Sequence, residues 1–301
     1  MPRSIINVER YAQLPSESER ERVIATHERI REVIESSSET EDMSVGTVLQ
    51  GSYANHTNTP RTSDVDIIVK LDGVWYEESV SADPADWSRL SREQAAQREH
   101  SRLRTQVSAA LRPCFRDEVE ERSKVIHVRA TPSGSRRPAD VLPVIGYRLR
   151  ASTGAVHEGV CFWPRFGTAP VSNFPEQHKV ALTQKGRPER AGSNFKGIVR
   201  AIKSVRNDLL ERYVLHSSIA PSYWIEGLLT NVPDEQFHGT WEDALHEVLQ
   251  WLRRALDIWR PSHQGFLQAN GIRPLFGPGA WNDTSARILI DRVFERAFVK
   301  P

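Results

Sequence analysis

Hydrophobic and polar positions divide the chain into an α/β first half and a mostly helical second half. Hydrophobic residues at helical spacing between Val23 and Ile34 predict a long helix, with Ser16 as its N-cap and Glu19 as the capping-box partner. A charged, amphipathic pattern predicts a second helix at about 91–111. Runs rich in β-branched residues predict strands at 45–49, 64–71, 125–130 and 139–149.

The pattern changes after about residue 175. A stretch rich in Gly, Arg and Pro at 184–193 predicts a loop. Helical periodicity then predicts four helices, at 195–212, 222–231, 241–259 and 284–298. The hydrophobic stripe from Trp241 to Trp259 is typical of a core-facing helix rather than a ligand site. We therefore expect an α+β protein with two domains, 1–175 and 176–301.

Two acids lie at the start of the second predicted strand. Alternate side chains of a strand share a face, so Asp64 and Asp66 are expected to point the same way, with Val65, Ile67 and Val69 anchoring the other face. Two carboxylates on a buried strand repel each other unless a cation lies between them. Hard oxygen ligands favour Mg²⁺ or Mn²⁺. The alternative is a polar strand start without a ligand, since Asp-x-Asp often occurs by chance.

A Gly-Ser pair ends the preceding strand. Ser52 lies twelve residues before Asp64, and Gly51 permits close approach of a ligand to the backbone. The serine hydroxyl and the free N–H groups of such a turn can hold a phosphate. Alone, the pair would indicate only an ordinary turn. Arg61 is a further candidate for phosphate contact, or a residue at the rim of the cleft.

A third acid, Asp140, stands in an otherwise apolar strand. An isolated acid there is costly unless it is paired or bound to metal. One alternative is a salt bridge to Arg136 or Arg137. With Asp64 and Asp66, however, Asp140 would complete a site for two metal ions of the kind that catalyses nucleotidyl transfer.

Composition limits the classes of partner and compartment. Forty Lys and Arg residues against thirty-nine Asp and Glu residues give a net charge of +1, which provides no general attraction to nucleic acid or membrane. The two cysteines have no metal-type spacing, and the sequence predicts no signal peptide and no membrane span. We expect a cytoplasmic protein.

Taken together, these motifs resemble those of a known family. The Gly-Ser, Asp-x-Asp and later Asp arrangement is similar to that of DNA polymerase β-type nucleotidyltransferases. The segment at 49–71 resembles that of the bacterial CD-NTases, which are relatives of cyclic GMP–AMP synthase and oligoadenylate synthase; its sequence is LQGSYANHTNTPRTSDVDIIVKL. PEQH at 175–178, GSNFKGIVRAIKSVRNDL at 192–209 and PSYWIEGLL at 221–229 extend the resemblance over nearly the whole chain.

The resemblance implies a fold and further site residues. It implies a polymerase β-like core with a mixed sheet and a long N-terminal helix, followed by a helical C-terminal domain that closes the nucleotide cleft. It also implies that Lys203 and Ser222 hold the donor triphosphate and that Tyr223 stacks on a base. From the residues alone, Lys203 lies on a basic face with Lys196 and Arg200 that could simply be solvated. Likewise, Ser222 fits an N-cap, and Tyr223 could be a core residue.

The expected function is that of an enzyme which joins NTPs into a cyclic or linear oligonucleotide and releases pyrophosphate. By resemblance, the product would be a second messenger that switches on an effector in anti-phage defence, and regulatory partner proteins are conceivable. One alternative is a nucleotidyltransferase acting on RNA, a small molecule or a protein. The other is a catalytically inactive nucleotide-binding scaffold, which the presence of all three acids disfavours.

Overall fold

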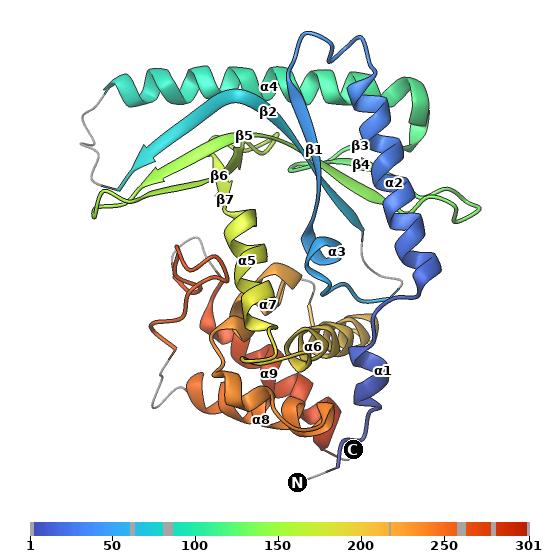
Figure 1. Ribbon diagram of the computed structural model, residues 1–301, viewed down its shortest axis with the longest axis vertical. Coiled ribbons are helices and arrows are strands. Elements are labelled where there is room, and N and C mark those ends of the chain that lie inside the picture. Colours follow the sequence, from blue (N-terminus) through green and yellow to red (C-terminus); the bar gives the residue numbers. More distant parts are fainter. Residues whose placement is uncertain are drawn as a thin grey trace. The chain divides into compact units, whose positions relative to one another are not determined.

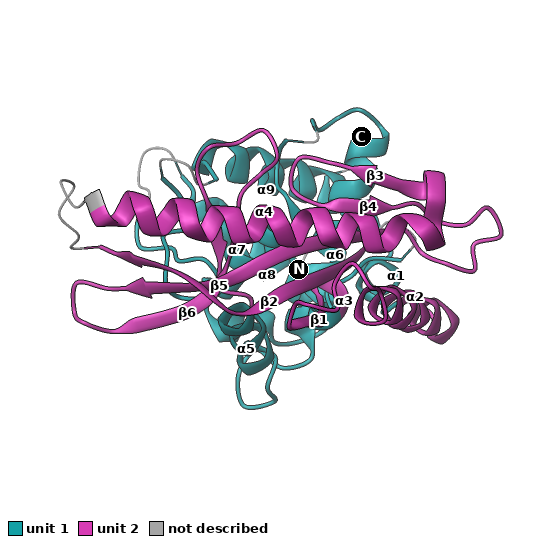
Figure 2. Cartoon of the chain, turned by 90° about the horizontal axis from the view of Figure 1, so that it is seen from above, with its two compact units in different colours: residues 1–15, 54–63, 176–301 teal, residues 16–53, 64–175 magenta. Residues whose placement is uncertain are grey.

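A computed structural model describes residues 3–60, 64–80, 87–216, 218–257, 263–277 and 281–299, without the side chain of Trp87. The chain forms two compact units (Figure 2). The sheet unit comprises residues 16–53 and 64–175, and the helical unit comprises residues 1–15, 54–63 and 176–301. The chain thus crosses between the units more than once. The division into domains at 175/176 stays a prediction.

Within the described residues, one mixed sheet of seven strands forms the centre of the sheet unit (Figure 1). The strands are β1 (Val45–Gln50), β2 (Val65–Ser79), β3 (Val119–Glu121), β4 (Ile126–Val128), β5 (Ala139–Arg150), β6 (Val156–Phe162) and β7 (Val171–Asn173). Their order is β1-β2-β5-β4-β3, with β6 paired to the later half of β5 and β7 paired to β6. The β2–β5 pair is parallel and the other pairs are antiparallel, which confirms the predicted mixed sheet.

Long helices accompany this sheet. The unit contains α2 (Glu17–Glu35), α4 (Trp87–Phe115), the one-turn helix η1 (Arg116–Glu118) and the start of the short helix α3 (Gly51–Asn55). Figures 1 and 2 show α4 running along the sheet, where it packs against β2 and β5. Ser16 caps α2 as predicted, since its hydroxyl accepts a hydrogen bond from the Glu19 N–H at 3.3 Å.

The central strand β2 shows the alternation that the sequence predicts. Val65, Ile67 and Val69 are at most 1% exposed, whereas Asp66 between them is half-buried on the other face. The strand is longer than predicted and continues to Ser79. Its pairing with β5 is irregular between Leu71 and Trp75, where Gly73 adopts a left-handed backbone conformation with φ +76°. A bulge of this kind breaks the hydrophobic alternation, which is why the pattern predicts an end near Leu71.

His100 on α4 gives the sheet unit a testable sensitivity to acid. Its side chain is buried, and Nε2 hydrogen-bonds to the Pro143 carbonyl oxygen at 3.2 Å. Burial lowers the pKa of His100 to about 4. Because the unfolded chain then takes up the proton first, stability contributed by neutral His100 should be lost as the pH falls below about 6.5.

Between pH 7.5 and pH 5 this loss should amount to about 2 kcal/mol. His100→Gln keeps a donor toward the Pro143 oxygen but cannot titrate, so the variant should lose less stability on acidification. Urea unfolding at the two pH values measures the difference. His157→Gln, at a partly exposed position on β6 of the same unit, is the control. Equal losses in wild type and His100→Gln would contradict this origin of acid sensitivity.

The helical unit is built around one amphipathic helix. It contains α1 (Val8–Ala12), α5 (Pro175–Lys185), α6 (Asn194–Glu211), α7 (Ser222–Thr230), the one-turn helix η2 (Asp234–Phe237), α8 (Trp241–Ala255) and α9 (Asp283–Phe298). Ile198, Ile202 and Val205 of α6 are fully buried in a core to which α7, α8 and α9 also contribute. The residues at 184–185, predicted to be loop, instead complete α5.

The stripe on α8 is core, as predicted. Ala244, Leu245, Val248, Leu249 and Leu252 are fully buried. Leu256 caps this helix, which therefore ends before the predicted limit at 259. Trp259 lies outside the described residues.

Among the described residues, no helix has the length and apolar character needed to cross a bilayer.

Candidate metal and nucleotide site

Polar residues form a row across four neighbouring strands of the sheet unit. Gln50 on β1 is paired with Asp66 on β2, Asp66 with Asp140 on β5, and Asp140 with His127 on β4. Side chains of directly paired residues point to the same face of a sheet. The row therefore places Asp66, Asp140 and His127 on one face, opposite Val65 and Ile67.

Three side chains of this face converge closely enough to share a metal ion. Ligand atoms of Asp64, His127 and Asp140 all lie within 4.8 Å of one another. His127 Nδ1 is 2.6 Å from Asp140 Oδ1, and a guanidinium nitrogen of Arg122 is 3.8 Å from the same oxygen. Two carboxylates and an imidazole are a donor set that divalent cations accept, with Mn²⁺ tolerating nitrogen better than Mg²⁺.

The electrostatics of Asp64 favour a cation at this place. Burial raises the pKa of the Asp64 carboxyl, and the neighbouring charge of Asp140 raises that pKa further, against smaller opposing effects of His127, Arg122 and Arg137. A carboxyl with a raised pKa resists ionisation because nearby negative charge and poor solvation disfavour the anion. A bound cation would relieve both effects.

Asp66 lies on the predicted face, and its carboxylate has a further neighbour directly after β1. Its carboxylate is not part of the group formed by Asp64, His127 and Asp140, but lies against the backbone of Gly51. Gly51 has φ +69°, and a Cβ atom built there would lie 1.9 Å from Asp66 Oδ2. The glycine thus provides the close approach that its place before Ser52 predicts, but the group that approaches it is the Asp66 carboxylate.

The other predicted residues of the sheet unit are found as follows. Ser52 is the second residue of α3 and is half-buried. Asp140 has His127 and Arg122 as partners, whereas Arg136 contacts Glu118 and Arg137 lies 3.8 Å from Glu19. Arg61 lies outside the described residues.

In the helical unit, the predicted triphosphate ligand Lys203 is 2% exposed. The solvated basic face considered for it is therefore wrong. Its Nζ lies 2.6 Å from Glu226 Oε1, 3.2 Å from the Thr57 carbonyl oxygen and 3.3 Å from Thr57 Oγ1. The ammonium is thus surrounded by acceptors of the protein itself.

Ser222 and Tyr223 begin α7 and are both half-buried. Pro221 is the N-cap, and Ser222 Oγ accepts a hydrogen bond from Arg206 at 3.3 Å. The Tyr223 ring stacks on the ring of His178, with centroids 4.6 Å apart. Its hydroxyl oxygen lies 3.2 Å from Asn270 Nδ2 and 3.4 Å from Gln268 Oε1. One face of the Tyr223 ring is therefore already occupied by His178.

His127 is the residue that the motif search missed. The sequence holds part of the signal, because the turn-forming residues TPSGS at 131–135 lie between the predicted strands 125–130 and 139–149 and indicate that these strands pair. Symmetric pairing about that turn would bring position 127 opposite position 139, one residue away from its observed partner Asp140. A single histidine in a short strand becomes a candidate site residue only when the pairing of that strand with residues 139–149 is known in register.

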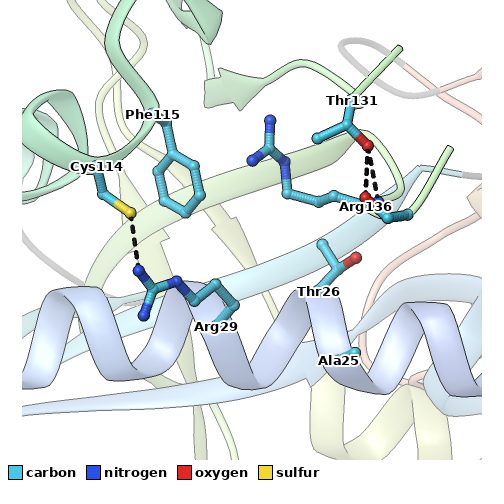
Figure 3. Close-up of a pocket in the computed structure, with 8 residues that line it drawn as sticks. Ala25, Thr26, Arg29, Cys114, Phe115, Thr131 and Arg136 are labelled. Carbon is cyan, nitrogen blue, oxygen red and sulfur yellow. Dashed lines mark hydrogen bonds between the residues drawn. The ribbon is translucent and has the colours of Figure 1, made fainter. Parts of the chain in front are cut away.

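A separate pocket of about 260 Å³ lies elsewhere on the sheet unit (Figure 3). Its lining residues are Ala25, Thr26, Arg29, Cys114, Phe115, Thr131, Ser135 and Arg136. Arg29 donates to Cys114 Sγ at 3.2 Å, and the backbone N–H of Arg136 donates to Thr131 Oγ1 at 3.0 Å. Both guanidinium groups also have carboxylate partners, Glu32 at 3.7 Å and Glu118. No predicted site residue lines this pocket.

Comparison with known proteins identifies the family of this chain. Residues 183–296 match the family described as the cGAS/DncV-like nucleotidyltransferase C-terminal helical domain. A cyclic UMP-AMP synthase from Rhodothermus marinus is 31% identical over 246 residues, 79% of this chain and 80% of the relative. A cyclic dipyrimidine nucleotide synthase from Legionella pneumophila is 29% identical over 283 residues, 92% of each chain.

The fold agrees as well. The solved structure of the Rhodothermus marinus c-UMP-AMP synthase with Apcpp and Upnpp aligns with a TM-score of 0.77 and 27% identity, covering 96% of this chain and 94% of that one. Sequence similarity and fold thus extend together over most of this chain. The chain belongs to the CD-NTase family of nucleotidyltransferases.

Proposed function

We propose that this protein joins two nucleoside triphosphates into a cyclic dinucleotide and releases pyrophosphate. The observation that carries the proposal is the convergence of Asp64, Asp140 and His127 beside Asp66 on one face of the sheet. The named activities of the Rhodothermus and Legionella relatives support it. Those two names differ in the bases joined, so the choice of bases does not carry over to this chain.

We propose that Asp64, Asp66 and Asp140 are the catalytic acids and hold two divalent cations, Mg²⁺ or Mn²⁺. When bound, such ions stabilise the charge of the triphosphate and of the attacking hydroxyl. The raised pKa of Asp64 and its place within 4.8 Å of Asp140 support a cation between these two acids. His127, through its 2.6 Å contact, would hold the Asp140 carboxylate in one orientation.

For the nucleotide we propose the following contacts, each argued from the surroundings of its own residue. Gly51 and Ser52 would face phosphate oxygens, since this turn starts a helix and carries a half-buried hydroxyl. Ser222 would contact the triphosphate, and Tyr223 would offer a base the ring face that His178 does not cover. By family resemblance Lys203 is a further triphosphate ligand.

We also propose that the product acts in the cytoplasm as a second messenger that activates an effector in anti-phage defence, with regulatory partner proteins as controllers of the enzyme. The family membership supports this proposal. Measuring the cyclic dinucleotide in producing cells before and after phage infection tests it. An unchanged concentration would argue against a role in defence.

The catalytic proposal is tested with labelled NTPs. The protein is incubated with each NTP alone and with each pair, in Mg²⁺ or in Mn²⁺, and the products are treated with phosphatase and identified by mass spectrometry. We expect a phosphatase-resistant product with the mass of a cyclic dinucleotide. Label found only in added RNA would favour an RNA-directed enzyme, and no incorporation under any condition would favour an inactive scaffold.

Replacing His127 with alanine should weaken metal binding. Without the contact at 2.6 Å, the Asp140 carboxylate keeps only the longer contact to Arg122 at 3.8 Å among the partners described above, and loss of such support commonly costs about 10–100-fold in metal affinity. Titration of the protein with Mn²⁺, followed by calorimetry without nucleotide, measures the change. His157→Ala, on β6 of the same unit, is the control. An unchanged Mn²⁺ affinity would remove His127 from the site.

A further inference from the structure

An imidazole of α5 lies against the tyrosine that we propose to stack on a base. The rings of His178 and Tyr223 are stacked, with centroids 4.6 Å apart and planes 24° from parallel. Rings at this separation attract each other beyond the effect of burial alone. His178 is 3% exposed, whereas Tyr223 is half-buried. The imidazole therefore forms the interior side of the pair, and the tyrosine forms the side nearer the surface.

The sequence of α5 turns this imidazole toward the interior of the helical unit. His178, Leu182 and Lys185 are the buried residues of the helix, and their spacing of four and three residues puts them on one face. The His178 ring contacts two residues of α7 that lie three positions apart, Tyr223 through its face and Glu226 through Nε2. Two contacts from one helix fix both the position and the tilt of the imidazole.

Glu226 is a firm acceptor for the His178 ring. His178 Nε2 lies 2.6 Å from Glu226 Oε2, and the same carboxylate accepts hydrogen bonds from Lys203 at 2.6 Å and from Asn55 at 3.3 Å. Burial alone would raise the pKa of Glu226, but the charge of Lys203 and the hydrogen bond from His178 hold that pKa far below its usual range. Because a carboxylate can only accept, Nε2 carries a proton and donates it to a buried anion.

The second ring nitrogen of His178 indicates which property of the side chain matters. Among the residues that the structure describes, Nδ1 is buried and has no hydrogen-bond partner. A buried polar atom without a partner costs free energy. A side chain that served only as a donor to Glu226 would gain nothing from this nitrogen. The flat ring against Tyr223 gives the imidazole a second role.

Tyr223 is held at its hydroxyl end by other residues. The hydroxyl donates to Gln268 Oε1 at 3.4 Å and accepts from Asn270 Nδ2 at 3.2 Å. With both ends of the side chain held, the motion left to the ring is rotation about its long axis. The energy of that torsion is only weakly restricted by the side chain itself. A second ring stacked flat against one face restricts it.

We propose that His178 is a positioning residue, which sets the plane of the Tyr223 ring for stacking on the base of an NTP. The base would then be the third ring of a stack that starts at the buried imidazole. A ring whose plane is set beforehand loses less freedom on binding, so the nucleotide binds more tightly. The inference rests on the proposed function, in which Tyr223 contacts a base, whereas the packing of His178 on Tyr223 is independent of that function.

Three substitutions of His178 separate the ring from the hydrogen bond. His178→Phe keeps a ring without a donor, His178→Gln keeps a donor without a ring, and His178→Leu keeps neither. Calorimetry in Mg²⁺ measures the Kd of the four α,β-methylene NTPs and of inorganic tripolyphosphate, which has no base. The values of kcat and KM are measured with the NTPs that are turned over. His246→Gln is the control, since it removes an imidazole that packs on Phe298 of the same unit, with centroids 5.1 Å apart.

We expect His178→Gln and His178→Leu to raise the Kd and KM of the NTP about tenfold and to leave kcat within about threefold, because a stacked base contributes binding of this order. His178→Phe and the control should stay within about twofold of wild type, and no variant should change the Kd of tripolyphosphate more than about twofold. A Kd in His178→Phe as high as in His178→Leu, or a wild-type Kd in His178→Gln, would overturn the role of the ring. A tenfold weaker binding of tripolyphosphate would overturn it as well.

A variant that does not fold leaves a pair that still decides. His178→Phe and His178→Leu differ in the ring, so different Kd values for the NTP support the proposal and equal values overturn it. His178→Gln and His178→Leu differ in the donor, so equally weakened binding supports the proposal and wild-type binding by His178→Gln overturns it. The thermal unfolding temperature of each variant shows which pairs are available.

Fluorine NMR of the protein labelled with 3-fluorotyrosine tests the ring packing without nucleotide. The chain has six tyrosines, and the signal of Tyr223 is the one that disappears in Tyr223→Phe. We expect its chemical shift to approach that of the unfolded protein in His178→Gln and His178→Leu, but not in His178→Phe. A wild-type shift in the two variants without a ring would show that His178 does not set the Tyr223 ring. If wild type bound no NTP, the proposed function would fail while this signal still decided the packing, so the two proposals fail separately.

Discussion

Replacing Asp66 with asparagine should abolish product formation while the fold survives. The substitution removes one negative charge and almost no volume, at a half-buried position on β2 whose neighbours Val65 and Ile67 maintain the core. Loss of a charged metal ligand removes several kcal/mol of charge stabilisation from the transition state, which corresponds to a fall in kcat of about 1,000-fold or more. Single-turnover assays with labelled NTPs measure the rate.

The matched control for this variant lies on the same strand. Asp72 is exposed, and Ser44 Oγ donates to its carboxylate at 3.3 Å. Asp72→Asn makes the same chemical change without touching the polar row, and its kcat should stay within about twofold of wild type. Wild-type turnover by Asp66→Asn would show that this carboxylate is not a metal ligand, and the assignment would then have to rest on Asp64, Asp140 and His127.

Local patterns predicted the elements of the sheet well, and the reason is physical. Alternation places Asp66 opposite Val65 and Ile67 whatever the rest of the chain does, because the side-chain period of a strand is fixed. The row of polar residues from β2 through β5 to His127 on β4 could not be predicted in the same way. It depends on strand order and register, which hydrophobic periodicity does not encode, so His127 became a candidate only after the pairing was known.

In the helical unit, sequence spacing identified a helix face but not the groups that contact it. The basic face of α6 was recognised from spacing, but spacing alone does not reveal what meets that face. Lys203 meets the buried Glu226 and Thr57 rather than solvent, and Arg200 meets the backbone of His56 and Ala12. Both partners lie far away in sequence or in an irregular segment. A cation that resemblance assigns to phosphate can therefore have its charge satisfied inside the protein.

Gly51→Ala should reduce activity about 100-fold or more with only a modest loss of stability. The left-handed conformation, φ +69°, costs a residue with a side chain about 1–2 kcal/mol. The new Cβ atom would lie 1.9 Å from Asp66 Oδ2, so the carboxylate must move, and a displacement of about 1 Å can cost 100-fold in rate. Gly46→Ala on β1 is the matched control, since no atom lies within 4 Å of its new Cβ. Thermal unfolding and kcat are measured for both variants. A fall in kcat with Tm lowered by only a few degrees would show that the site requires a residue without a side chain at position 51. Full activity in Gly51→Ala would mean that the contact between this glycine and Asp66 does not set the position of the carboxylate during turnover.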